Sequence, residues 1–230
     1  MSKAKTTRHW LIAAFEPFAS RKENNSKLVQ NEIKKLEAEL RANSTNAATA
    51  TSAANADPST DTQWIYEFHY LTLPVVYKDC FPALDQEVKK LAASGIKLEG
   101  VLALGEGAEE FKLETQGHNL DDVAELADNS GEVRANKKIF ADHPVDMPFA
   151  LRFPFEAFSR IRTSKNAGFY ICNHLCSEMS YHYGKLDTLP YFGFIHVPKV
   201  GCGGMFTPDV CAAVIVNGFK KIPPADYLKG

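Results

Sequence analysis

The residue whose position best suits chemistry in this sequence is Cys172. It lies where an apolar run at 169–171, expected to form a strand, gives way to apolar residues at helical spacing, namely Leu175, Met179 and Tyr183. A thiol at a helix N-terminus has its pKa lowered by the helix dipole, and the N–H groups of the first turn can bind an oxyanion. Cys172 is therefore a candidate nucleophile for acyl transfer, although a free cysteine is more often simply buried.

Two other side chains could act with this thiol. His196 follows the apolar run 192–195, so it should emerge at the carboxyl edge of a parallel sheet, where α/β enzymes bind their ligands. Glu114 follows the apolar run 101–104 and a polar loop, and a carboxylate there could fix the tautomer of a histidine and stabilise its imidazolium form. Taken singly, each also fits an ordinary structural role.

The elements that must position these residues alternate along the chain. We expect strands at 9–14, 64–73, 100–104, 169–171 and 193–197, and helices at 26–41, 81–93, 155–162, from about 173 and after 209. This alternation predicts a single-domain α/β/α sandwich around a mostly parallel twisted sheet, spanning residues 1–230. Residues 42–62 are almost entirely small and polar, which predicts a flexible surface insertion.

Composition and charge exclude several classes of function. The net charge is −2 and the 26 basic residues form no dense block, so an electrostatic grip on nucleic acid is not indicated. No apolar run approaches the roughly 20 residues that a bilayer helix needs, and we expect neither a membrane span nor a secretion signal. Five cysteines at no disulfide-scaffold spacing fit a reducing compartment, and we expect the cytoplasm.

Several segments of the chain resemble motifs of the pyroglutamyl peptidase I family of cysteine peptidases, in the family's order and with similar spacing. They are FEPF at 15–18 with NNS at 24–26, LPVVY at 73–77, LGE at 104–106 with the stretch through Glu114, Asn119 and 128–129, AGFYICNH at 167–174, and FIHVP at 194–198. The segment at 167–174 resembles the family's nucleophile motif closely, the segment at 194–198 resembles its histidine motif, and together these segments cover both halves of the chain.

The resemblance implies a cysteine-type omega peptidase that removes N-terminal pyroglutamate from peptides, with Cys172 as nucleophile, His196 as base and Glu114 orienting that histidine. An aromatic pocket suits the neutral lactam ring of pyroglutamate. The residues at matching substrate-binding positions are Phe15, Phe18, Asn24, Glu106, Tyr170 and Ile171. The resemblance also implies a homo-oligomer that needs neither a metal nor an organic cofactor.

The sequence departs from the family pattern around the candidate site. Ala14 and Ala19 replace glycines, the loop 106–110 reads Glu-Gly-Ala-Glu-Glu instead of a Gln-Ala-Gly-Gly-like run, and Glu125 lies about where the family has an arginine. An acid in place of a cation would raise the pKa of a nearby thiol and disfavour an oxyanion. We therefore expect substrate preference or turnover to be altered more readily than the type of reaction.

Two rival interpretations stay open at this point. One is a metal site made by the cysteines and histidines of 172–176 with His182, but on a helix His174 would point roughly 160° away from Cys172. The other is a family member that binds blocked N-termini and has lost catalysis. The altered loop and the missing arginine favour that second alternative, in which the thiol of Cys172 would show no enhanced reactivity.

Overall fold

A six-stranded sheet organises the computed structural model, which describes residues 4–46 and 62–222 of the 230-residue chain. The sheet strands are β1 (Ala4–Phe15), β2 (Thr62–Leu73), β3 (Leu98–Glu106), β4 (Lys112–Glu114), β9 (Arg162–Ser164) and β10 (Tyr191–Val197). The helices are α1 (Asn25–Asn46), α2 (Tyr77–Ala93), α3 (Ile171–Tyr183) and α4 (Pro208–Phe219), with a 3₁₀ turn at Phe155–Phe158. Two small ribbons pair β5 (Gln116–His118) with β8 (Pro148–Ala150), and β6 (Asp121–Val123) with β7 (Arg134–Lys137).

The order of strands in the sheet is β2-β1-β3-β10-β4-β9. β1 pairs in parallel with β2 and β3, and β3 pairs in parallel with β10, whereas β4 runs antiparallel to β10 and parallel to β9. A strand buried on both faces reads as a continuous apolar run, and β10 is buried along its whole length. The mostly parallel α/β sandwich predicted from the sequence is confirmed.

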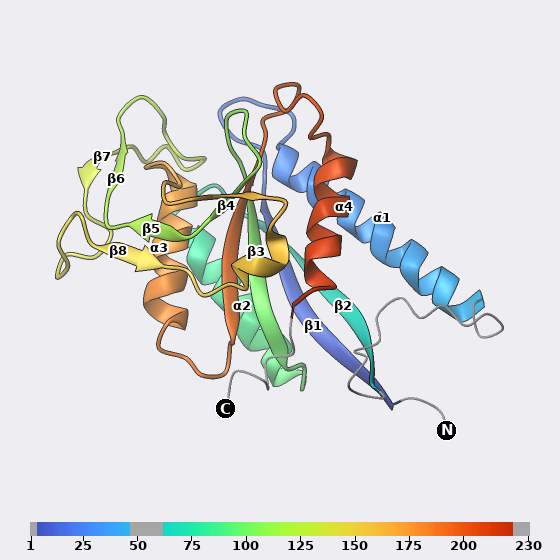
Figure 1. Cartoon of the computed structure of the whole chain (residues 1–230). Helices are drawn as coiled ribbons and strands as arrows, with labels where there is room; N and C mark the ends of the chain where they lie inside the picture. The colour runs from blue at the N-terminus through green and yellow to red at the C-terminus, as the bar shows by residue number, and fades with distance from the viewer. Residues whose placement is uncertain (1–3, 47–61, 223–230) are drawn as a thin grey trace.

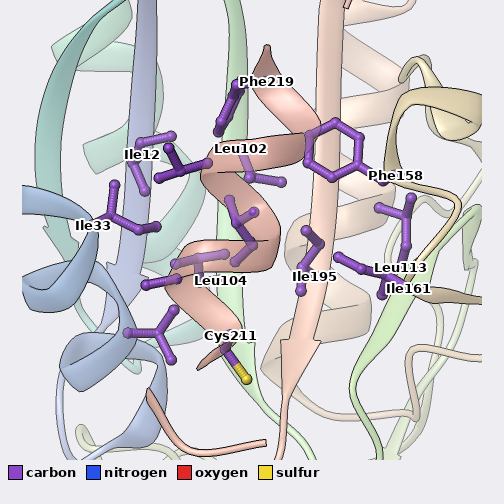
Figure 2. Packing of buried hydrophobic residues seen from close by; sticks show 14 of the residues in the cluster. Ile12, Ile33, Leu102, Leu104, Leu113, Phe158, Ile161, Ile195, Cys211 and Phe219 are labelled. Atoms are coloured by element: carbon purple, nitrogen blue, oxygen red, sulfur yellow. The ribbon is translucent and has the colours of Figure 1, made fainter. Parts of the chain in front are cut away.

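The two faces of the sheet carry separate apolar cores. Figure 1 shows α1 and α4 on one face and α2 and α3 on the other. Side chains alternate between the faces along each strand, so Ile12, Leu102 and Ile195 pack under α1 and α4, as Figure 2 shows. Their neighbours Ala103 and Phe194 pack under α2 and α3. The alternation fixes which strand residues can meet the N-terminus of α3.

Two helices extend beyond their predicted bounds. α1 was expected to end near residue 41 but continues to Asn46. α2 was expected to begin at 81 but begins at Tyr77, with Pro82 inside it. The carboxylate of Asp128 accepts the Tyr77 N–H at 3.0 Å across 51 residues of sequence, so a distant side chain satisfies this helix start.

The helix predicted at 155–162 is wrong. Only the 3₁₀ turn Phe155–Phe158 forms, preceded by Pro154, and the chain then enters β9. β9 pairs in parallel with β4 and begins at Arg162, so the last residue of the expected helix lies in a strand of the sheet. The local pattern was compatible with a helix, but the tertiary pairing decided otherwise.

The insertion predicted at 42–62 lies mostly outside the described residues, because 47–61 are not among them. α1 accounts for its first residues, up to Asn46, and β2 begins at Thr62. The single-domain organisation over 1–230 and the flexible character of this segment therefore stay predictions. Over the part of the chain that the structure describes, no helix combines the length and apolar character that crossing a bilayer requires.

Candidate active site

Cys172 is the second residue of α3, so its thiol lies at the helix N-terminus as predicted. The strand expected at 169–171 is wrong: Phe169 is 40% exposed in a bend, and Ile171 already opens the helix. Gly168, with a φ of +80°, turns the chain just before. Tyr170 precedes the helix, and its side chain makes no capping bond to the N–H groups of the first turn.

His196 and Glu114 meet on the face of the sheet that α3 covers. His196 lies two residues after Phe194 on β10, so the two side chains project from the same face of the sheet. Their rings contact edge to face with centroids 5.0 Å apart. Glu114 on β4 is the antiparallel partner of Phe194, and it is fully buried. Nδ1 of His196 lies 2.8 Å from Oε1 of Glu114. This contact leaves Nε2 as the ring nitrogen available to a thiol.

Gly105 places the thiol beside the strand that carries the histidine. It is the residue of β3 that pairs in register with His196. A Cβ atom on Gly105 would lie 2.9 Å from Sγ of Cys172 and 2.6 Å from the ring of Phe194, so the thiol packs on backbone where only glycine fits. Three segments far apart in the sequence therefore place Cys172, His196 and Glu114 near the carboxyl ends of β3 and β10.

The electrostatic setting of Cys172 differs from the sequence-based expectation. Removal of the thiol from water raises its pKa to about 12, and the carboxylates of Glu114 and Glu106 add to the rise. The helix dipole was expected to favour the thiolate, whereas desolvation and the two carboxylates shift the pKa in the opposite direction. The thiol is therefore protonated at neutral pH until a base takes its proton.

Glu106, predicted to bind substrate, is held by the protein itself. Its carboxylate forms an ion pair with Arg21 and accepts the backbone N–H of Asn25 at 2.8 Å. The guanidinium of Arg21 also lies over the ring of Phe18, 4.7 Å from its centroid. Sequence reasoning missed Arg21, a cation that reaches the candidate site from the loop between β1 and α1. Glu125, which lies about where the family has an arginine, is exposed after β6.

We expect Glu106→Gln to lower the pKa of Cys172. A carboxylate beside a thiol disfavours the thiolate, so its removal favours the thiolate, and the charge of Arg21 stays in place. The rate of iodoacetamide alkylation of Cys172 at pH 8 should rise, because the thiolate fraction increases roughly tenfold for each unit that the pKa falls and the lower nucleophilicity of the thiolate offsets only part of this gain. The measurement is the pH profile of alkylation, with Glu110→Gln as the control, because Glu110 is an exposed acid of the same loop. An unchanged profile for Glu106→Gln would contradict the assigned cause.

An aromatic wall lies next to the nucleophile. The rings of Phe18 and Tyr170 are 6.0 Å apart and tilted by 37°. The Tyr170 hydroxyl donates to the carbonyl of Ala127 at 2.9 Å, which fixes the ring. Phe15 and Ile171 are buried in the same core under α2 and α3. Four of the six predicted substrate-binding residues thus lie in one apolar region beside Cys172.

Asn24 has a different surrounding from the one expected of a substrate ligand. It immediately precedes α1, and its side-chain oxygen accepts from the backbone and hydroxyl of Ser26, at 3.0 and 2.8 Å. Its amide donates to the carbonyl of Glu16 at 3.0 Å. Asparagine before a helix commonly makes such capping bonds. The structure therefore places Asn24 in the framework of the loop.

Glu16 joins three of the sequence motifs. Its Oε1 accepts the backbone N–H of Val75 at 3.2 Å and the side-chain amide of Asn129 at 2.8 Å. The same amide donates to the carbonyl of Pro17 at 3.0 Å. The first motif, the loop before α2 and the turn at 128–129 are therefore connected. The motifs could be recognised in the sequence, but the hydrogen bonds that connect them could be seen only in the fold.

The residues that follow Cys172 hold the start of α3 in place. Asn173 exchanges hydrogen bonds with the backbone of His118, at 2.7 and 3.0 Å. His174 places Nδ1 2.8 Å from the carboxylate of Asp121, which also pairs with Arg134. This buried network fixes the ring of His174, and among the described residues the cysteines and histidines of 172–182 form no group of three whose ligand atoms converge on one point.

Known proteins resemble this chain in sequence. A family model described as pyroglutamyl peptidase matches residues 43–221, which is more than half of the chain. A pyrrolidone-carboxylate peptidase of Fusobacterium nucleatum is 26% identical over 165 residues, covering 66% of this chain and 73% of that protein. One of Brachyspira hyodysenteriae is 30% identical over 140 residues, covering 56% and 66%.

Solved structures share the fold. The pyrrolidone carboxyl peptidase of Thermococcus litoralis superposes with a TM-score of 0.66 at 22% identity, covering 96% of this chain and 95% of that one. The pyroglutamyl peptidase I of Bacillus amyloliquefaciens gives 0.65 at 17% identity, covering 93% of each chain. The sequence and family matches define the class: the protein is a cysteine-type omega peptidase. Within that class, the chain belongs to the pyroglutamyl peptidase family, as the sequence motifs predicted.

Proposed function

We propose that this protein removes the N-terminal pyroglutamyl residue of peptides through a thiol acyl-enzyme, with Cys172 as nucleophile, His196 as general base and Glu114 orienting the histidine. The observation that carries the proposal is that these three residues converge near the carboxyl ends of β3 and β10. The thiol packs on Gly105, which pairs with His196, and His196 lies 2.8 Å from the buried Glu114. Membership of the pyroglutamyl peptidase family supports the substrate class.

Acylation begins from a neutral thiol. Because the pKa of Cys172 is about 12, attack is coupled to transfer of the thiol proton to Nε2 of His196. The sulfur bonds to the pyroglutamyl carbonyl carbon, and the electron pair of the C=O bond moves to its oxygen. The first-turn N–H groups of α3 supply donors for this oxyanion. Glu114 stabilises the imidazolium that forms.

The peptide bond then breaks. His196 donates its proton to the departing amine of the second residue, and a thioester remains on Cys172. A water molecule attacks the thioester carbonyl while His196 accepts one of its protons. Collapse of this second intermediate releases pyroglutamate, and the sulfur recovers the proton from the imidazolium. Every proton in the cycle passes through one histidine, so its orientation is decisive.

The apolar wall supports selection of the blocked residue. Pyroglutamate is an uncharged five-membered lactam, and the rings of Phe18 and Tyr170 offer it aromatic surface. Phe15 and Ile171 lie behind them in the buried core. A free α-amino group would bring a charge against this surface, which costs desolvation energy.

The experiment that tests the proposal compares two fluorogenic amides, one of pyroglutamate and one of proline. Proline has the same ring size, but it lacks the lactam carbonyl and carries a charged amine. With a reducing agent present, we expect release from the pyroglutamyl amide, and a kcat/KM at least about 10²-fold lower for the prolyl amide. Comparable rates for the two amides would contradict the proposed substrate.

The raised pKa of Cys172 favours a second candidate function, a silent member that binds blocked N-termini without cleaving them. Such a protein would release no fluorophore from either amide. Its thiol would also keep the low reactivity toward alkylation that a pKa of about 12 implies. Tight binding of a pyroglutamyl peptide, measured by calorimetry, combined with both of these results would support this alternative.

We also propose that the protein works in the cytoplasm as a homo-oligomer on peptides with N-terminal pyroglutamate. All five cysteines are free in the structure, which fits a reducing compartment. The oligomeric state follows from the family resemblance. Light scattering coupled to size-exclusion chromatography measures it directly, and a mass equal to that of one chain would contradict it.

A further inference from the structure

Two histidines and a glutamate gather on adjacent strands, away from the candidate active site. His9 lies on β1 directly opposite Glu67 of β2, and His69 lies two residues further along β2, opposite Leu11. Residues two apart on a strand share a face, and so do register partners on neighbouring strands. His9, Glu67 and His69 therefore project from the same face of the sheet, at the edge formed by β2 (Figure 1).

The ligand atoms of these three residues converge. Nδ1 of His9 lies 3.2 Å from Nε2 of His69, and the rings stack with centroids 5.4 Å apart. One atom from each of the three side chains, including a carboxylate oxygen of Glu67, lies within 4.8 Å of the other two. Among the described residues, this is the one group of three or more such side chains that meets this condition. All three residues are half-buried, so an ion could still reach them.

The spacing of the two nitrogens fits a shared metal ion. Zn–N bonds of 2.0–2.1 Å at a tetrahedral angle place two imidazole nitrogens about 3.3–3.4 Å apart. A simple hydrogen bond between the two rings would also explain the 3.2 Å distance. The carboxylate of Glu67 converges on the same two nitrogens and completes a set of three donors. Two imidazoles and one carboxylate, with a position left for water, form a ligand set that suits zinc better than magnesium or calcium.

We propose that His9, Glu67 and His69 form a zinc site that ties the edge strand β2 to β1. The site is separate from the catalytic proposal. His9 lies six residues before Phe15, and therefore about 20 Å along β1 from the catalytic edge. The ion bridges two strands on the side that β2 leaves as a sheet edge, so its expected effect is on stability. This inference stands or fails independently of the proposed peptidase activity.

The direct test is a zinc titration by isothermal calorimetry. It uses full-length Cys172→Ala protein, so that zinc bound by the reactive thiol does not contribute. We expect about one equivalent of Zn²⁺ to bind. His9→Gln and His69→Gln in the same background should weaken the affinity by roughly 10–100-fold or more. Glu67→Gln should weaken it as well, because it removes the charged donor. Glutamine at each histidine position retains a hydrogen-bonding group.

The matched control is His182→Gln, which removes an exposed histidine of α3 outside the cluster and should leave zinc affinity unchanged. Absence of binding in the Cys172→Ala protein overturns the proposal. Binding that survives both His9→Gln and His69→Gln also overturns it, since the zinc would then lie elsewhere. If a variant fails to fold, X-ray absorption of the zinc-loaded parent decides, because two imidazole ligands are expected there and their absence contradicts the site.

Thermal unfolding gives a second measurement. A ligand that binds only the folded state raises the Tm, and at a zinc concentration about 100 times the Kd the rise should be roughly 5–10 °C for a chain of this size. At the same zinc concentration the rise should fall to about half or less in His69→Gln and persist in full in His182→Gln. An equal rise in both variants would contradict a zinc site at the edge of β2.

Discussion

Cys172→Ala is expected to abolish the release of fluorophore from a pyroglutamyl amide, lowering kcat/KM by at least about 10⁴-fold. The sulfur of Cys172 must bond to the carbonyl carbon of the substrate, and alanine offers no nucleophile in its place. Sγ packs against Gly105, so the substitution leaves only a small void there. The measurement is steady-state hydrolysis with a reducing agent present, beside a thermal unfolding curve that verifies folding.

The controls for this prediction come from the other cysteines. Cys202→Ser changes an exposed thiol and should retain full activity. Cys176→Ala changes a buried thiol one turn further along α3, so it tests whether loss of any sulfur in this helix is damaging. Substantial activity in Cys172→Ala would assign the nucleophile to another residue. Equal losses in Cys172→Ala and Cys176→Ala would point to damage to the helix instead of to the chemistry.

The layers of this fold were predictable because parallel strands buried on both faces leave a continuous apolar trace. The runs that became β3 and β10 have this character, and both were placed from the sequence. The ends of the helices and strands were harder to predict. The run at 169–171 is apolar like a strand, yet Gly168 turns the chain and Ile171 enters α3. Apolar character shows that a segment is buried, and only neighbouring strands decide whether it pairs.

The candidate site was predictable where local sequence carries the position, as for Cys172 at a helix start and His196 at a strand end. Its electrostatics were not. Arg21 pairs with Glu106 across 85 residues of sequence, and Asp128 satisfies the start of α2 from 51 residues away. The pKa of Cys172 likewise depends on distant residues, since it reflects burial and the carboxylates of Glu114 and Glu106 from other strands. Spacing in one sequence contains no such information.

Glu114→Gln is expected to lower kcat by about 10²–10⁴-fold while KM stays within about threefold. Glu114 is fully buried and bonds to Nδ1 of His196, so it holds the imidazole in the tautomer that presents Nε2 as a base. Glutamine has nearly the same shape, but it carries no charge to stabilise the imidazolium. The loss therefore falls on the transition state and spares substrate binding, which steady-state kinetics separates as kcat and KM.

The same substitution should make the thiol more reactive. The carboxylate of Glu114 raises the pKa of Cys172 more than that of Glu106 does, so its removal lowers the thiol pKa. Iodoacetamide alkylation at pH 8 should then accelerate while hydrolysis slows. Glu106→Gln is the matched control, because it should accelerate alkylation without the loss in kcat. If Glu114 only supported the fold, its replacement would depress both reactions together, so a rise in one and a fall in the other identifies a carboxylate that acts on the histidine.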